Sequence, residues 1–260
     1  MQLPIYQVDA FTDRLFAGNP AAVVPLESWL PDEVMQKIAF ENNLSETAFY
    51  VRGPGGFAIR WFTPAVEVDL CGHATLGSGF VAFHRGDVKG DVLEFSSRSG
   101  PLRVRREGDF LVLDFPAHVP QAAPLPDGLI EAMGRAPAEV WRAGDDYLLV
   151  YASEAEVRAL QPDFARLGSV DARGVIATAP GTSVDFVSRF FAPRVGVLED
   201  PVTGSAHTRL TPYWSKRLGK TELTARQVST RGGSLRCRMA GERVEIAGQA
   251  VLYLAGAITV

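Results

Sequence analysis

A weak internal repeat constrains the fold of this chain more than any other sequence feature. The segment RWFTPAVEVDLC (60–71) aligns without gaps with RFFAPRVGVLED (189–200), at an offset of 129 in a chain of 260 residues. Each copy runs into a turn of small residues and then a helix-like segment, CGHATLGSGFVAF in the first and DPVTGSAHTRLTPYW in the second. Because the offset is about half the chain, we predict two similar halves related by duplication.

The rest of the pattern predicts many short strands and few helices. We expect strands at 2–9, 21–25, 45–51 and 57–62 and several more between 91 and 115, with a surface helix starting at Pro31. The helix that begins near Ala74 has almost no polar face, which indicates a buried helix wrapped by a sheet. Parallel βαβ repeats with regular amphipathic helices are not apparent, so the predicted class is α+β.

The predicted halves meet in a proline- and alanine-rich stretch, PAHVPQAAPLPDG (116–128). We assign residues 1–118 to the N-terminal half and 119–260 to the C-terminal half, and allow the last strand to pack back on the N-terminal half. At 47% hydrophobic residues, the chain is apolar enough for a sizeable core.

Charge and composition exclude several classes of function. The formal net charge is -4 and no basic stripe is visible, so a nucleic-acid partner is not expected. No apolar run approaches the ~20 residues of a membrane span, so we expect no membrane partner. The two cysteines, Cys71 and Cys237, are too far apart in sequence to suggest a disulfide framework, and favour the reducing cytoplasm.

The turn that follows the first repeat is a candidate binding site. Cys71, Gly72, His73 and Ala74 lie where a strand passes into the buried helix. Free amides at a helix start attract an anion such as a carboxylate, and His73 could carry a proton near neutral pH. The alternative is a helix cap with a structural histidine.

The second repeat ends in an equivalent turn. Thr203 and Ser205 offer hydroxyls there, Gly204 offers a bare amide, and Asp200 is a candidate for proton transfer. An aspartate before a proline also commonly stabilises a turn, and that reading of Asp200 stays open.

Glu46 is the third candidate. It lies in the apolar segment NLSETAFYV, where alternation places it on one face with Leu44, Ala48 and Tyr50. Partial desolvation in such a strand suits a carboxylate to general acid/base work near neutral pH. The alternative is an edge-strand glutamate that faces water.

Other types of site find no support. No GxGxxG, GxxxxGK[ST] or GxSxG motif is present, and no lysine sits in a recognisable pyridoxal-phosphate context. The four histidines lack metal-ligand spacing and form a poor zinc set with the two cysteines. We therefore expect neither a cofactor nor a metal.

Taken together, the motifs resemble the PhzF family of the diaminopimelate-epimerase-like superfamily. The motifs that carry the resemblance are VDAFTD (8–13), GNPAAVV (18–24), NLSETAF (43–49), RWFTP (60–64), CGHATLG (71–77), EDPVTGSAH (199–207), PYW (212–214) and RGG (231–233). The resemblance implies two pseudo-symmetric domains, each a barrel-like sheet around a central helix, with the active site between them. It also implies a homodimer and a cofactor-free reaction on a small carboxylate.

The same resemblance implies roles for the candidates. Glu46, His73 and Asp200 become catalytic, and the residues expected to bind substrate are Gly72, Ala74, Thr203, Gly204, Ser205 and Cys71. The leading hypothesis is an isomerase that relocates a proton.

Two alternatives remain, an epimerase or racemase and a non-catalytic small-molecule binder. The gap-free alignment puts Asp200 opposite Cys71, which argues against a racemase with two thiols. Arg209 departs from the family pattern, and we expect it to add an anion contact or to reach solvent.

Overall fold

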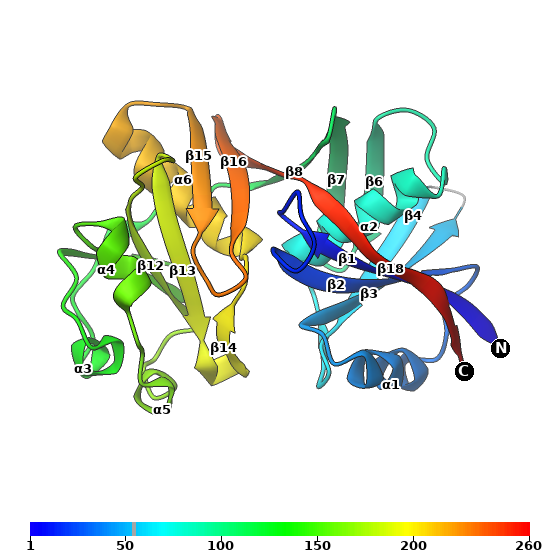
Figure 1. Ribbon diagram of the computed structural model, residues 1–260, viewed down its shortest axis with the longest axis horizontal. Coiled ribbons are helices and arrows are strands. Elements are labelled where there is room, and N and C mark those ends of the chain that lie inside the picture. The colour runs from blue at the N-terminus through cyan, green and yellow to red at the C-terminus, as the bar shows by residue number, and fades with distance from the viewer. Residues whose placement is uncertain (54–55) are drawn as a thin grey trace. The chain divides into compact units, whose positions relative to one another are not determined.

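A computed structural model describes residues 1–53 and 56–260, and these form two compact units. Unit 1 comprises Met1–Asp114 together with Ala247–Val260, and unit 2 comprises Phe115–Ile246. The last strand of the chain thus belongs to the N-terminal unit, where it pairs antiparallel with the first strand (Figure 1).

Unit 1 is a mixed sheet with one helix on each face. Its strands run in the order β18-β1-β2-β3-β4-β6-β7-β8, and β5 pairs with β4. The bounds are β1 Gln2–Ala10, β2 Asn19–Leu26, α1 Asp32–Asn42, β3 Glu46–Gly53, β4 Gly56–Phe62, β5 Glu67–Val68, α2 Gly72–His84, β6 Val92–Ser97, β7 Gly100–Glu107, β8 Phe110–Pro116 and β18 Ala250–Thr259.

The strand β2 shows why the two helices lie on opposite faces. Ala22 and Val24 belong to the core that α1 covers, together with Met35 and Ile38 of that helix. Ala21 and Val23 point the other way, toward α2. A strand covered on both faces loses the alternation of polar and apolar residues, which explains the unbroken apolar run of NPAAVVPL.

The predicted burial of the helix after Cys71 is confirmed. Most residues of α2 are buried, and the helix contacts β1, β2, β3, β7 and β18, so the sheet curls around it (Figure 1). Its small residues permit this close approach. A Cβ placed on Gly79 would lie 2.7 Å from Cγ1 of Val104 on β7.

The sheet contains parallel strand pairs that were not apparent from the sequence. In unit 1, β2 and β3 pair in parallel with α1 as the crossover, and β4 pairs in parallel with β6. The amphipathic pattern of α1 predicted the helix, which begins one residue after Pro31 and ends at Asn43 in the left-handed conformation. The pattern carried no information on the direction in which the next strand pairs.

Unit 2 repeats this plan. Its strands run in the order β9-β10-β11-β12-β13-β15-β16, again with β11 and β12 parallel, and β14 pairs with β13. The bounds are β9 Gln121–Ala122, α3 Leu129–Met133, β10 Glu139–Ala143, β11 Asp146–Val150, α4 Glu154–Ala159, α5 Phe164–Leu167, β12 Gly174–Pro180, β13 Phe186–Ala192, a 3-10 turn Pro193–Val195, β14 Val197–Asp200, α6 Gly204–Leu218, β15 Glu222–Gln227, β16 Gly233–Ala240 and β17 Arg243–Gly248.

The helix α6 is the counterpart of α2. Most of its residues are buried, and it contacts β15 and β16. Trp214 anchors it to two further strands: its ring stacks on Phe186 of β13 at 5.8 Å, and its Nε1 donates a hydrogen bond to Oγ1 of Thr178 on β12 at 3.0 Å. The other face of this sheet packs against the short helices α3, α4 and α5.

The structure shows equivalent ion pairs in the two copies of the sequence repeat, but it changes the alignment between the copies at one place. Arg60 clamps Glu67 with Nε and Nη2 at 2.6 and 2.7 Å, and Arg189 clamps Glu199 in the same way at 2.7 and 2.9 Å. The arginines keep the offset of 129, but the two glutamates are 132 residues apart.

The longer turn between β13 and β14 therefore inserts three residues into the second copy. Trp61 pairs with Val68, whereas the matching Phe190 pairs with Asp200. The gap-free alignment is thus wrong beyond this turn. Cys71 corresponds to Thr203, because these two residues occupy the N-cap positions of α2 and α6.

Among the helices of the described residues, none combines the length and the apolar character that a membrane crossing requires.

Candidate active site

The start of α2 carries the first set of predicted residues. Cys71 is the extended N-cap residue, Gly72 and His73 open the helix, and Ala74 is fully buried within its first turn. Cys71 makes no side-chain cap hydrogen bond, and the first amides of the helix keep their positive partial charge.

Glu46 meets His73 in unit 1. Glu46 is the first residue of β3, which lies between β2 and β4, so the interpretation as an edge-strand glutamate facing water is wrong. Its Oε2 lies 3.2 Å from Nε2 of His73, and the side chains are only 19% and 7% exposed, respectively. The contact has the length of an ion pair but not the alignment of a hydrogen bond, and neither atom bonds to any other described residue. Both atoms therefore retain capacity for a ligand.

The other ring nitrogen of His73 faces two polar side chains. Its Nδ1 lies 3.2 Å from Nδ2 of Asn19 and 3.5 Å from Sγ of Cys71. With the amide nitrogen of Asn19 against it, Nδ1 accepts and Nε2 carries the proton toward Glu46. A half-turn of the Asn19 amide would present its oxygen instead, which is the partner that a doubly protonated ring needs.

Burial and charge set the protonation states of this cluster. Burial lowers the pKa of His73, whereas the negative charge of Cys71, when ionised, and that of Glu46 raise it. Burial, and then Glu46, raise the pKa of the Cys71 thiol, which stays protonated at neutral pH. Glu46 is therefore the charge that favours the imidazolium form of His73.

The cluster also contains the donor types that bind transition metals. One donor atom each from Glu46, Cys71 and His73 lies within 4.8 Å of the other two. The closest contacts of the imidazole join Nδ1 to Cys71 and Nε2 to Glu46, so its two nitrogens face different partners. The expectation that the protein uses no metal stays a prediction.

The predicted residues of unit 2 form a second, tightly held turn. The buried side chain of Gln227 accepts a hydrogen bond from the Thr203 amide at 2.9 Å and donates to the Asp200 carbonyl at 2.7 Å. The Thr203 hydroxyl donates to the Asp200 carboxylate. These bonds support a turn-stabilising role for Asp200, and its catalytic role stays a prediction, as does the shared cleft between the halves.

The side chain of Arg209 is only 12% exposed, so the expectation that it reaches solvent is wrong, whereas a contact with an added anion stays a prediction. Its Nε lies 3.1 Å from Oδ2 of the fully buried Asp146 and donates to the Ala143 carbonyl, and its Nη1 donates to the Ser205 carbonyl at 2.8 Å. Both carboxylate oxygens of Asp146 also accept hydrogen bonds from Arg173. One buried carboxylate therefore holds two guanidinium groups.

Sequence reasoning missed four residues that shape the two turns: Asn19, Asp146, Arg173 and Gln227. Only Asn19 carried a signal, since it lies in the GNPAAVV motif. The other three act on residues at least 24 positions away, and nothing local marks them.

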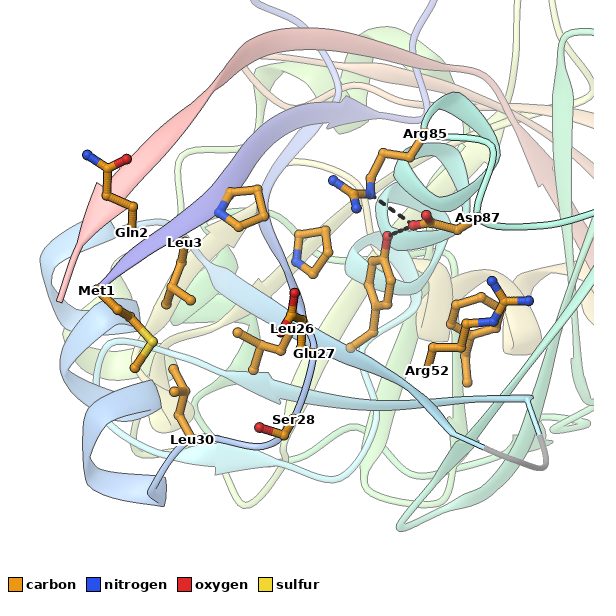
Figure 2. A pocket seen from close by; sticks show the side chains of 14 residues that line it. Met1, Gln2, Leu3, Leu26, Glu27, Ser28, Leu30, Arg52, Arg85 and Asp87 are labelled. Carbon is orange, nitrogen blue, oxygen red and sulfur yellow. Dashed lines mark hydrogen bonds and ion pairs between the residues drawn. The ribbon is translucent and has the colours of Figure 1, made fainter.

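A surface pocket of about 480 Å³ also occurs in unit 1 (Figure 2). It has an apolar floor that includes Leu3, Leu26 and Leu30, and a polar end where Tyr50 and Arg85 both bond to Asp87. None of the predicted site residues lines this pocket. It is therefore separate from the cluster at Glu46 and His73.

The comparisons with known proteins agree with this architecture. The chain is 58% identical over 258 residues to an "uncharacterized isomerase" of Pseudomonas aeruginosa, with 99% of both chains covered. A PhzF-family phenazine biosynthesis protein of Enterococcus faecalis has the same fold over all of both chains, with a TM-score of 0.97 at 49% identity. A hydroxyproline epimerase of Agrobacterium vitis shares the fold alone, with a TM-score of 0.63 at 9% identity over 99% of this chain and 92% of the epimerase.

These likenesses confirm the predicted α+β fold. A family model described as "Phenazine biosynthesis-like protein" matches residues 8–256, which is nearly the whole chain. The chain therefore belongs to the PhzC-PhzF family of phenazine biosynthesis-like proteins.

Proposed function

We propose that this protein is an isomerase that relocates a proton on a small carboxylate-bearing metabolite, without a cofactor. Glu46 removes a proton from carbon, and the electron pair left behind moves into the adjoining unsaturated system. The proton returns at a different carbon, from Glu46 or from Nε2 of His73. The product is an isomer, so the step balances without an oxidant or a reductant.

The contact between Glu46 and His73 is the observation that carries this proposal. A carboxylate and an imidazole lie 3.2 Å apart, both are largely buried, and their facing atoms have no other partner among the described residues. A base within reach of an acid, in a site that excludes most water, is the arrangement that proton transfer at carbon needs. The family relatives that carry the name isomerase agree with it.

The protonation states fit the same roles. Burial lowers the pKa of His73 and the neighbouring charge of Glu46 raises it; in its imidazolium form, the ring would stabilise the negative charge that develops on the substrate. The protonated thiol of Cys71 beside the ring is unsuited to be the base at neutral pH.

Glu46→Gln tests the proposal directly. Small unsaturated and amino carboxylates would be incubated with the protein in deuterium oxide, and deuterium uptake at carbon would be followed by NMR. For any compound that exchanges, we expect Glu46→Gln to slow uptake by about 10²- to 10⁴-fold, the usual contribution of a positioned acid/base group.

Glu41→Gln is the matched control, because Glu41 is exposed and lies at the end of α1. We expect this variant to exchange at the wild-type rate. Undiminished exchange in Glu46→Gln would show that Glu46 is not the base.

An epimerase or racemase is the second candidate, favoured by the thiol of Cys71 next to His73 at 3.5 Å. The corrected repeat puts the hydroxyl of Thr203, not a second thiol, at the matching position. Loss of optical rotation in an amino or hydroxy acid, abolished in Cys71→Ala, would favour this candidate. Full activity in Cys71→Ala would argue against it.

Binding of a metabolite without turnover or exchange would favour the third alternative, a non-catalytic binding protein. The cytoplasmic location and the homodimer stay predictions.

A further inference from the structure

Glu46, Cys71 and His73 bring three kinds of metal-binding donor together within unit 1. One donor atom from each side chain lies within 4.8 Å of the other two. In a tetrahedral zinc site, with bonds of about 2.0 to 2.3 Å, neighbouring donor atoms are roughly 3.3 to 3.6 Å apart. The three side chains are therefore close enough to surround one ion after a small rotation.

Two of these donor atoms are buried and form no hydrogen bond with any described residue. They are Nε2 of His73 and Oε2 of Glu46, which face each other at 3.2 Å. The His73 side chain is 7% exposed, and an unpaired polar atom in such a place is costly. The spacing is close to the roughly 3.3 Å that separates a nitrogen and an oxygen bound to the same zinc ion. One cation would satisfy both atoms at once.

The charges of the cluster match those of a divalent cation. Glu46 supplies one negative charge, and Cys71 supplies a second one once a metal displaces the proton of its thiol. His73 binds a metal as the neutral imidazole, so the three ligands together carry two negative charges. The largest charge effects on Cys71 and His73 come from within the cluster itself. A bound divalent ion would therefore leave this buried site without net charge.

The chemistry of the donors favours zinc over the hard divalent cations. Magnesium and calcium prefer six or more oxygen ligands, whereas this cluster offers one carboxylate, one thiol and one imidazole. Zinc accepts nitrogen, sulfur and oxygen donors, and three protein ligands with one open position are enough to hold it. The cluster therefore fits Zn²⁺ better than Mg²⁺ or Ca²⁺.

Asn19 can hold the imidazole in the orientation that a metal requires. Its amide lies 3.2 Å from Nδ1 of His73. When Nε2 binds the ion, Nδ1 carries the ring proton, and the amide oxygen of Asn19 accepts it after a half-turn of the side chain. The thiol of Cys71, 3.5 Å from Nδ1, has to turn toward the ion. Glu46 is the way in, since its side chain is 19% exposed.

We propose that Glu46, Cys71 and His73 bind a zinc ion that inhibits the protein. The thiol proton leaves to solvent, and the thiolate, the carboxylate and Nε2 each donate an electron pair to the ion, which keeps its oxidation state. The inhibitory part rests on the proposed function, because the ion occupies the oxygen with which Glu46 takes a proton from carbon. The ion has no part in the reaction itself, and free zinc therefore regulates the isomerase.

The binding test uses metal ions alone and needs no substrate. Cobalt(II) chloride would be titrated anaerobically into chelator-treated protein and followed by absorption, and zinc chloride would be titrated by calorimetry. We expect a thiolate-to-cobalt charge-transfer band that zinc abolishes by displacing the cobalt. Cys71→Ser should lose the band and bind zinc more than about 100-fold more weakly, since even the loss of an indirect partner of a metal ligand costs 10- to 100-fold.

Cys237→Ser is the matched control, because Cys237 is the other cysteine of the chain and is buried in unit 2. We expect this variant to keep the cobalt band and the zinc affinity of the wild type. Glu46→Gln should keep the band but bind zinc at least roughly 10-fold more weakly, because it loses a charged ligand. Melting temperatures without metal show whether the variants are folded, and Glu46→Gln carries the comparison if Cys71→Ser is not.

The site would be overturned by the absence of a cobalt band in the wild type, by a band that persists in Cys71→Ser, or by undiminished zinc affinity in Glu46→Gln. For a compound that exchanges deuterium, zinc should stop the exchange and a chelator should restore it. Unchanged or faster exchange with zinc bound would overturn the inhibition. The two proposals fail separately, because zinc binding is measured without substrate: a zinc site in a protein whose exchange does not depend on Glu46 would refute only the proposed base.

Discussion

The cluster around Asp146 makes a sharp prediction about the stability of unit 2. Asp146→Asn keeps the size of the side chain but removes the carboxylate that Arg173 and Arg209 share. The new amide would turn a donor toward one of the guanidinium groups, which also carry only donors. We expect this variant to fold but to be clearly less stable.

The magnitude follows from the burial of the three side chains. Asp146 is fully buried and Arg209 is 12% exposed, whereas Arg173 is 38% exposed and can be solvated after the change. Breaking a buried ion pair from one side costs about 3–5 kcal/mol, and the exposure of Arg173 places this case at the lower end, near 3 kcal/mol. A loss of that size corresponds to a thermal midpoint lower by roughly 10 °C.

Urea and thermal denaturation, followed by circular dichroism, measure the loss. Asp171→Asn is the matched control, because Asp171 is 94% exposed and pairs with the half-exposed Arg194. Its cost should stay within about 0.5 kcal/mol. A double-mutant cycle with Arg209→Met adds a second measure. The double variant should lose about 1–3 kcal/mol less than the sum of the single variants, because no charged arginine then remains buried without its partner.

Equal stability of Asp146→Asn and Asp171→Asn would refute this reasoning. Strict additivity of the two stability losses in the double-mutant cycle would also refute it, because it would mean that the charges of Asp146 and Arg209 do not interact.

Two further predictions concern the central helices. Gly79→Ala should destabilise the protein by about 1–3 kcal/mol, because its Cβ would press on Val104 of β7 at 2.7 Å, and Gly77→Ala should be neutral or stabilising by up to about 1 kcal/mol, because its nearest neighbour is 3.7 Å away. Thermal melts of the two variants check this pair, and equal midpoints would contradict it. Burial lowers the pKa of His207 to about 4 in the folded protein, whereas in the unfolded chain its pKa is the ordinary value of about 6.5. Between these two pH values, His207 binds a proton in the unfolded chain but not in the folded protein. Stability should therefore fall as pH drops from about 6.5 toward 4, by up to about 3 kcal/mol, and His207→Gln should flatten the pH profile measured by urea denaturation. An unchanged slope would show that other groups cause the acid sensitivity.

Much of the fold could be predicted from the sequence because it depends on local patterns of apolar, polar and turn-forming residues. The apolar faces of α2 predicted a buried helix, and the arginine–aromatic–phenylalanine repeat at 60 and 189 predicted two halves. The start of α2 was a recognisable turn for the same reason. Glu46 became a strong candidate only through the family motifs, since its own strand left an exposed interpretation open.

The tertiary structure decided what those patterns could not. The pairing of β2 with β3 in parallel depends on contacts across the sheet, and local periodicity is the same for either direction. The three-residue insertion before β14 showed only through strand partners, which replaced Asp200 with Thr203 as the counterpart of Cys71.

The cluster at Glu46 and His73 and the cluster around Asp146 show the same difference between what the sequence and what the tertiary structure determine. The sequence by itself determined that Glu46 and His73 are present in suitable local settings, but their 3.2 Å contact joins residues 27 positions apart. Asp146, Arg173 and Arg209 come from three separate elements, and each looks like an ordinary charged residue in its own segment. Only folding shows that one buried carboxylate holds two cations, because the cost of burying charge depends on what surrounds each group in space.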